Sequence, residues 1–293
     1  MVNFKNLKTK LPWWTKIGTK IAVSRLPLNH DFWKSLNLFE HGFMEKPDYA
    51  YRVFKEHFDR ASGQKTFQPG FVSLELGPGE SLHSALVSNS FGSSKAYIVD
   101  VAKFASEDMQ IYRDMADFLR NKGLEAPNLD NVQSLEDVMD SCGGSYLTSG
   151  IASLQSIEDN SVDFIWSHTV LEHIKRHEFL DTMKELRRVM RDDGVCSHEV
   201  DLKDHLELSL NNLRFTEKVW ESDLMSNSGF YTNRIQYSHM LSMFEEAGFE
   251  VQVTDIKRWD SMPIERSKLN QDFQGFSDED LCVSDFCVIL KAA

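Results

Sequence analysis

Residues 71–81 read FVSLELGPGES, an apolar run followed by a glycine-rich turn. The apolar run is typical of a buried strand, and Gly77, Pro78 and Gly79 end it. The following residues, 81–90, suit a helix. Glycines at such a junction let the backbone approach a ligand closely, and the first turn of a helix offers N–H groups that have no partner within the helix. The stretch therefore predicts a ligand-binding loop between a strand and a helix.

The alternation of strands and helices continues along the chain. Strand-like runs lie at 71–76, 95–100, 145–149, 162–167, 194–202, 249–259 and 285–292. Helical stretches lie at 81–90, 103–123, near 133–141, 177–191 and 238–248. Strands that alternate with helices pair in parallel, and two final strands without a full helix between them suggest a reversed hairpin at one edge. The sequence predicts an α/β fold with a doubly wound, mostly parallel seven-stranded sheet of the Rossmann-like kind.

Two segments stand outside this alternation. Residues 1–66 are rich in aromatic side chains, several at helical spacing, and we interpret them as a helical, basic-aromatic N-terminal cap. The domain proper then spans 67–293, with an insert at about 203–236 after the fifth strand. The first 30 residues hold six cations and no acid. Tryptophans with lysines at 1–25 could cap a cleft, pack against the domain or make weak contact with an anionic membrane surface.

Composition excludes several classes of protein. The chain of 293 residues holds 32 Lys and Arg against 45 Asp and Glu, a net charge of −13. A nucleic-acid binder would normally show a basic surface, so no nucleic-acid partner is expected. No apolar run approaches the roughly 20 residues of a membrane span. The four cysteines show neither CxxC pairs nor zinc-ligand spacing, which indicates a reducing, cytoplasmic location.

Asp100 strengthens the prediction of a nucleotide-type ligand. It closes the second predicted strand, at the distance from Gly77 where an acid binds ribose hydroxyls. A dinucleotide cofactor is disfavoured, because Ser81 occupies the third glycine position and Glu75 would repel a pyrophosphate. A carboxylate at position 75 suits a cationic amino-acid moiety instead.

Three motifs carry a family resemblance: ELGPGES at 75–81, YIVD at 97–100 and DNSVDFIWSHTVLEHI at 159–174. In them the chain resembles the class I S-adenosylmethionine-dependent methyltransferases, in particular the small-molecule branch of the type 11 style. The resemblance covers about residues 70–200 well and 236–291 loosely. It implies an enzyme that transfers a methyl group from S-adenosylmethionine, leaving S-adenosylhomocysteine, to an O or N atom of a small-molecule or glycan-type acceptor.

The resemblance also implies a set of cofactor-binding residues: Glu75, Gly77, Pro78, Gly79, Asp100, Val101, Ala152 and Ser167. The glycine loop and Glu75 would lie against the methionine part, Asp100 would bind the ribose hydroxyls, and Val101 would pack on adenine. Relatives often hold the adenine amine with an acid after the third strand. That position falls near Ile151 and is not acidic here, so backbone groups around Ala152 would replace it.

Four residues are candidates for the acceptor side: His168, His198, Asp201 and His205. His168 ends the fourth predicted strand, where parallel sheets place ligands, and a histidine suits proton transfer near neutral pH. The other three lie in HEVDLKDH at 198–205, at the end of the fifth strand. Charged residues on both faces of a central strand are costly unless they point into a cleft. The alternatives are a histidine at the edge of a cleft and a surface loop with solvated charges.

Neighbouring residues are open to simpler interpretations. Glu172 and His173 are read as an acid at a helix start and a packed histidine. Some relatives bind a divalent metal with an acid three residues before such a pair, but Thr169 stands there, so no metal is predicted. Arg234 in the insert could clamp an anionic acceptor or be solvated.

Two rival functions stay open. One is a non-catalytic protein that keeps the fold and acts as a partner-binding module. The other is a transferase that moves a different group from a related sulfonium compound. The second usually needs paired acids after the fourth strand, and no clear pair is present. Fold alone does not separate these functions.

Overall fold

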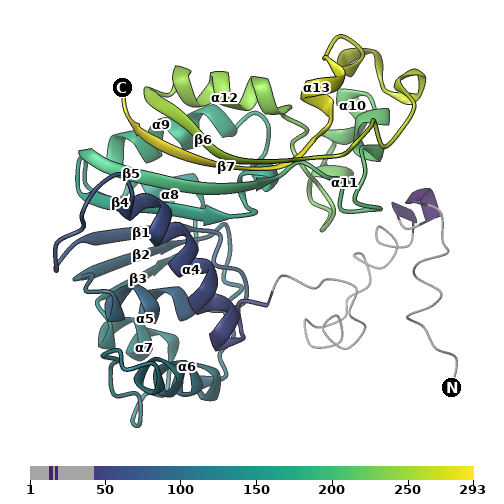
Figure 1. Ribbon diagram of the computed structural model, residues 1–293. Coiled ribbons are helices and arrows are strands. Elements are labelled where there is room, and N and C mark those ends of the chain that lie inside the picture. Colours follow the sequence, from purple (N-terminus) through teal and green to yellow (C-terminus); the bar gives the residue numbers. More distant parts are fainter. Residues whose placement is uncertain (1–12, 16, 19–42) are drawn as a thin grey trace, which may run out of the picture.

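The computed structural model describes residues 13–15, 17–18 and 43–293. At its centre is a seven-stranded sheet with the strand order β3-β2-β1-β4-β5-β7-β6 (Figure 1). The strands are β1 (Val72–Leu76), β2 (Lys95–Val99), β3 (Gly144–Leu147), β4 (Val162–His168), β5 (Met190–Asp201), β6 (Phe249–Arg258) and β7 (Val283–Ala292). The predicted doubly wound, seven-stranded sheet is confirmed.

The direction of the strands follows the prediction as well. Neighbouring strands among β1 to β5 are parallel, and β7 runs antiparallel to both β5 and β6. The chain builds outward from β1 to β3 and then crosses back to β4 on the other side of β1. Open α/β sheets bind ligands at the carboxyl ends of the strands beside such a reversal. The fold therefore directs attention to the ends of β1, β2, β4 and β5.

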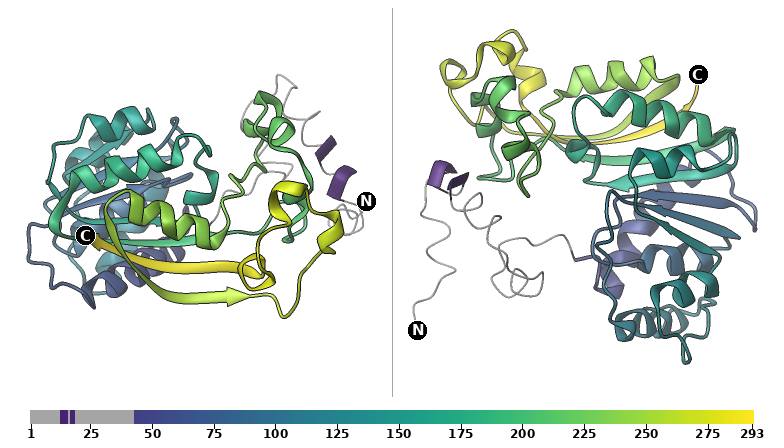
Figure 2. Two further views of the ribbon diagram at one scale, coloured as in Figure 1. Left: turned by 90° about the horizontal axis from the view of Figure 1, so that it is seen from above. Right: turned by 180° about the vertical axis from the view of Figure 1, so that it is seen from behind.

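Helices cover both faces of the sheet (Figures 1 and 2). One face packs against α4 (Pro47–Ser62), α5 (His83–Ser90), α6 (Met109–Asn121) and α7 (Leu135–Ser141). The other packs against α8 (Ile151–Gln155), α9 (Phe179–Val189) and α12 (Tyr237–Glu246). Each face has its own large hydrophobic cluster, so two apolar layers enclose the sheet. α4 belongs to the predicted N-terminal segment, yet its side chains enter the first of these layers.

Several element boundaries differ from the predicted ones. The helix expected at 103–123 begins only at Met109, because the Asp108 side chain accepts a hydrogen bond from the Gln110 amide and caps it there. The residues before Asp108 form a loop beside the end of β2. β5 begins at Met190, four residues before the strand expected at 194–202, so residues 190–193 lie within the strand range.

The insert at 203–236 contains short helices: η2 (Asn211–Arg214), α10 (Glu217–Trp220) and α11 (Asp223–Ser226). A second irregular segment, between β6 and β7, was not predicted and holds η3 (Arg266–Lys268), η4 (Gln271–Phe273) and α13 (Asp278–Leu281). Figure 1 shows α10, α11 and α13 gathered at one end of the sheet. The two segments share a hydrophobic cluster that includes Leu213 and Phe273.

The described part of the N-terminus touches the insert. Trp13 packs edge-on against Phe215, with ring centroids 5.8 Å apart, and the Arg214 guanidinium lies over the Trp13 ring. Most of the predicted cap before α4, and most of the predicted membrane-contact segment 1–25, lie outside the described residues. Among the residues that are described, no helix is long and apolar enough to cross a membrane.

Candidate active site

The glycine loop leaves β1 in a conformation that favours glycine. Gly77 has φ +66° and Gly79 has φ +70°, in the left-handed region. A Cβ atom at Gly77 would lie 2.6 Å from a methyl group of Val170, so the segment after β4 approaches this backbone closely. At Gly79, by contrast, no atom would lie within 4 Å of an added Cβ. Pro78 between them is buried. The loop therefore has one packed side and one open side.

Asp100 follows β2 and faces this loop. Its carboxylate accepts a hydrogen bond from the Val101 amide at 2.7 Å, and the amides of Ala102 and Gly79 also interact with it. Burial raises the pKa of Asp100 from 3.8 to about 6, although the three amides oppose this rise. The structure thus brings Asp100 and the glycine loop together, as a shared ligand would require.

Glu75 lies below the loop, near the end of β1. It is fully buried and accepts a hydrogen bond from the Ser84 hydroxyl of α5. Burial raises its pKa from 4.5 to about 8, and the nearby Asp100 raises it further, while Ser84 lowers it. Two carboxyl groups that each resist ionisation form a site that a cationic ligand would complement.

The remaining cofactor candidates lie in different surroundings. Val101 is 73% exposed, and Gly150 lies beside it at the start of α8. The Gly150 amide donates a hydrogen bond to the Asp100 carbonyl. Because Ala152 lies two residues after Gly150, this bond places the exposed Ala152 near the end of β2. Ser167, however, is fully buried, and its hydroxyl is hydrogen-bonded to His198 at 2.7 Å. Its side chain is thus engaged in the core beside β5.

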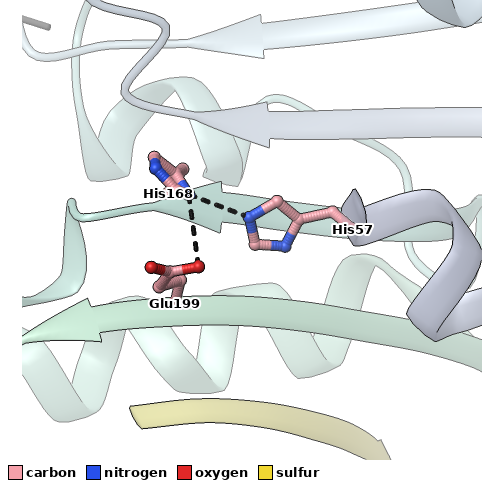
Figure 3. Close-up of side chains that lie close together, drawn as sticks. All are labelled: His57, His168 and Glu199. Atoms are coloured by element: carbon pink, nitrogen blue, oxygen red, sulfur yellow. Dashed lines mark hydrogen bonds and ion pairs between the residues drawn. The ribbon is translucent and has the colours of Figure 1, made fainter. Parts of the chain in front are cut away.

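His168 is part of a cluster that the sequence did not reveal. Nδ1 of His168 lies 3.3 Å from Nε2 of His57, which reaches it from α4, and 3.6 Å from a carboxylate oxygen of Glu199 on β5 (Figure 3). Nδ1 of His57 is in turn 2.9 Å from the Ser197 hydroxyl. The second ring nitrogen of His168 points away from both partners in Figure 3. His57 and Glu199 thus hold the imidazole of His168 at Nδ1, and Nε2 lies on the opposite side of the ring from them.

The electrostatics of this cluster favour neutral imidazoles. Burial lowers the pKa of His57 well below 6.5, and the neighbouring His168 lowers it further. Burial also lowers the pKa of His168, against the opposing influence of Glu199. A neutral imidazole can accept a proton, which a base must do. His57 escaped sequence analysis because its helix is distant from β4 in the chain.

His198 does not fit the predicted role of a base. It is fully buried on the opposite face of β5 from Glu199, and burial lowers its pKa to about 3. A histidine that stays neutral over nearly the whole pH range and contacts only core residues is suited to packing. Asp201 is likewise engaged: Lys203 lies 3.1 Å from it and also pairs with Asp285 of β7. Burial still raises the pKa of Asp201.

The segment after β4 brings a different group of residues together. It forms η1 (Leu171–His173), not a regular helix start. Glu172 is 1% exposed, and neither carboxylate oxygen has a hydrogen-bonding partner of normal geometry among the described residues. Burial raises its pKa well above 4.5, and the amides of Glu172 and Asp201 offset only part of this. His205, from the loop after β5, lies against His173 with ring centroids 4.7 Å apart.

Arg234 is a buried residue of the insert, so its interpretation as a solvated arginine is wrong. It is 4% exposed and has φ +56°. Its Nη1 donates to the Phe215 carbonyl at 2.7 Å, and its guanidinium lies between the rings of Trp220 and Phe273. Burial lowers its pKa to about 10. The side chain therefore holds the two irregular segments together and is not solvated, and it also lines a pocket beside Arg176 and Asp272.

Comparisons with known proteins agree with this geometry. The family model for a methyltransferase domain, of type 11, matches residues 74–197. Two solved structures illustrate the similarity. A SAM-dependent methyltransferase from Archaeoglobus fulgidus is 13% identical, with 90% of this chain and 100% of that chain covered and a TM-score of 0.47. One from Methanosarcina mazei is 15% identical, with 77% and 94% covered and a TM-score of 0.46. A search of curated proteins finds no match.

The family match runs from β1 into β5, so it takes in the glycine loop, Asp100 and His168. The acid after β2 lies within this segment, whereas β6 and the reversed β7 lie outside it. Residues 74–197 of the chain are therefore similar to the methyltransferase domains of the class I S-adenosylmethionine-dependent kind.

Proposed function

We propose that this protein transfers a methyl group from S-adenosylmethionine to an O or N atom of a small-molecule or glycan-type acceptor. The observation that carries the proposal is the pair of carboxyl groups, buried Glu75 and partly buried Asp100, beside a glycine loop that is open at Gly79. A cationic ligand would favour ionisation of both groups. S-adenosylmethionine carries a sulfonium and an ammonium group, and its product S-adenosylhomocysteine keeps the ammonium group.

The residues around the loop fit the parts of this cofactor. Glu75 would pair with the cationic amino-acid end, and Asp100 would accept hydrogen bonds from the ribose hydroxyls. Val101 offers an exposed apolar side chain on which adenine would pack. Backbone groups near Ala152 would approach the adenine edge. When bound, the cofactor supplies an electrophilic methyl group.

His168 is the residue we place nearest the acceptor. Its Nε2 would accept the proton that an attacking hydroxyl or amine loses, and His57 and Glu199 would hold the ring at Nδ1. The chain's main contribution is to position the acceptor and exclude water, which can be worth roughly 7–11 kcal/mol. Asp201 and His205 then belong to the surrounding wall, and His198 to the packed core behind it.

The flanking segments would shape the acceptor side. We propose that the predicted N-terminal segment 1–66 caps the acceptor side of the domain predicted at 67–293, with α4 packed into the core of that domain, and that the insert at about 203–236 forms a wall. The contact of Trp13 with Phe215 and Arg214 of the insert supports this arrangement. The acidic net charge favours a small-molecule or glycan-type acceptor over nucleic acid. We also propose a cytoplasmic location, as the sequence predicts.

Calorimetric titration of S-adenosylmethionine and S-adenosylhomocysteine into the full chain tests the proposal. We expect both to bind, and Asp100→Ala to weaken binding at least about tenfold, since hydrogen bonds to charged groups contribute roughly 1.5–3 kcal/mol each. The control is Asp130→Ala, which removes an exposed acid. Unfolding temperatures of the variants separate lost binding from lost folding.

Each outcome has a defined meaning. If neither compound binds the wild-type chain, the enzyme proposal is wrong and a partner-binding module becomes the better interpretation. If both bind and Asp100→Ala binds as tightly as Asp130→Ala, the proposed role of Asp100 toward the ribose is wrong.

A further inference from the structure

We propose that Glu172, His173 and His205 form a binding site for a divalent metal ion that accepts nitrogen and oxygen ligands, of which Zn²⁺ is representative. Glu172 and His173 belong to η1, and His205 lies in the loop after β5. One ligand-type atom from each residue lies within 4.8 Å of the other two. The sequence predicted no metal, because Thr169 stands where some relatives have an acid.

Glu172 is the residue that most needs a cation. It is 1% exposed, and both carboxylate oxygens lack a hydrogen-bonding partner of normal geometry among the described residues. A buried carboxylate without partners is costly, and coordination of a metal ion is one way to offset that cost. The nearby Lys203 offsets only part of this cost, because it is also paired with Asp201 and Asp285.

The hydrogen bonding of His173 prepares the ring for a metal ion. Its Nδ1 lies 2.8 Å from the Tyr231 carbonyl oxygen, and a carbonyl can only accept, so Nδ1 carries the proton. Nε2 of the neutral ring then carries the lone pair. Histidines that ligate metals almost always donate their other nitrogen to a carbonyl or carboxylate in this manner. The backbone of the insert therefore fixes the tautomer that coordination requires.

The donor set also matches a known coordination chemistry. Two imidazoles and one carboxylate are the protein ligands of many zinc sites that keep a further position open. The same set binds other divalent transition metals. Mg²⁺ and Ca²⁺ are not expected here, because they prefer oxygen ligands to imidazole nitrogen. His173 is exposed, whereas Glu172 is buried, so the ligands span from the protein interior to its surface.

The cluster of His57, His168 and Glu199 has similar residue types but does not call for a metal ion. Its two histidines hydrogen-bond to each other, and Arg60 lies 3.6 Å from the same Glu199 oxygen that faces His168. Arg60 already supplies a positive charge there, and it would repel a divalent ion. Among the described residues, no arginine forms an ion pair with Glu172 as Arg60 does with Glu199.

The location links the site to methyl transfer. Val170, two residues before Glu172, packs on Gly77 of the glycine loop, and the Glu172 carbonyl accepts from the Asn233 amide of the insert. An acceptor oxygen that reached the open position of the ion would lose its proton more readily. This consequence rests on the proposed function, whereas metal binding itself does not.

The test uses the full chain without a histidine tag, stripped of metal with a chelator. We expect calorimetric titration to show one equivalent of Zn²⁺ bound, and Co²⁺ to give the visible absorption of a four- or five-coordinate site with nitrogen ligands. Glu172→Gln and His205→Asn should each weaken Zn²⁺ binding by more than the roughly 10–100-fold that loss of an outer partner costs. His177→Asn, at an exposed histidine four residues from His173, is the matched control.

Two results would overturn the proposal. One is a wild-type chain that binds Zn²⁺ no more tightly than a doubly substituted Glu172→Gln/His205→Asn chain. The other is a Co²⁺ spectrum of six oxygen ligands that is unchanged in His205→Asn. His205 lies in a loop, so this variant decides the outcome even if Glu172→Gln fails to fold. S-adenosylmethionine is titrated in a separate experiment with the metal-free chain in the presence of chelator. Loss of cofactor binding is thereby distinguished from loss of metal binding.

Discussion

Glu75 shows how one buried side chain couples the candidate site to the stability of the fold. The residue lies near the end of β1 under the glycine loop and is buried, and among the described residues Ser84 donates a side-chain hydrogen bond to it. Burial holds its pKa at about 8, so the carboxyl group is largely protonated at neutral pH. An ionised form would become favourable only with a cation nearby. A group placed to receive a ligand thus weakens the ligand-free protein when it ionises.

This argument predicts a pH dependence of stability. The folded-state pKa is above the unfolded value, so the contribution of the protonated group is present below about pH 4.5 and is lost as pH rises through about 8. The free energy of unfolding of the wild type should therefore fall relative to Glu75→Gln between pH 5 and 8.5. The difference should reach a few kcal/mol, with an upper bound of about 5. Urea unfolding at several pH values measures it.

The control for this experiment is Glu158→Gln, which removes an exposed carboxyl group of the same type. Its unfolding free energy should follow the wild-type pH profile. Parallel profiles for the wild type and Glu75→Gln would show that Glu75 ionises normally in the folded protein, and the electrostatic account of the site would then be wrong.

At the scale of elements, the loop after β1 and η1 after β4 depend on each other. Gly77 is the contact point, since a Cβ atom there would meet the side chain of Val170 at 2.6 Å. Gly79 has a similar φ but faces open space. The two glycines therefore separate the cost of backbone strain from the cost of a steric clash.

We predict that Gly79→Ala costs about 1 kcal/mol of stability from backbone strain alone. Gly77→Ala should cost more, by roughly 1–3 kcal/mol, because Val170 must also move. Val170→Ala in the Gly77→Ala background should recover much of that extra cost, whereas it should not rescue Gly79→Ala. Denaturant unfolding of these four variants and of Val170→Ala alone completes the double-mutant cycles that measure the coupling. Additive effects of Gly77→Ala and Val170→Ala would contradict the proposed contact.

Local patterns predicted the elements well but not the side chains that meet between them. The strands, their alternation with helices and the glycine loop could be predicted from periodicity and turn residues, because these signals are local in the chain. His57 and Glu199 were missed because α4 and β5 bring them to His168 only in the folded molecule. His198 and Arg234 were misread because charge and residue type do not reveal burial. The late start of α6 depended on one capping residue, Asp108.

At the scale of the whole molecule, α4 joins the predicted N-terminal cap to the body of the domain. Val53, Phe54 and Ala61 of α4 are at most 1% exposed and belong to the same hydrophobic cluster as Phe164 and Trp166 of β4. The Phe54 ring lies 5.7 Å from the Trp166 ring. In energetic terms the helix is part of the sheet's own packing, so a boundary at 66/67 cuts through a core.

Truncation tests where the folding unit begins. A chain that starts at residue 43 keeps α4, and we expect it to unfold cooperatively with near-native stability, because both large clusters lie within 43–293. A chain that starts at residue 67 loses the covering of Phe164 and Trp166, where removal of a single buried phenylalanine already costs about 3–5 kcal/mol. It should fail to fold. Circular dichroism and urea unfolding distinguish the two, and Phe54→Ala in the longer chain provides an intermediate case. A stable, cooperative 67–293 chain would show that α4 is a separable cap, as the sequence predicted, and that the domain closes its core without it.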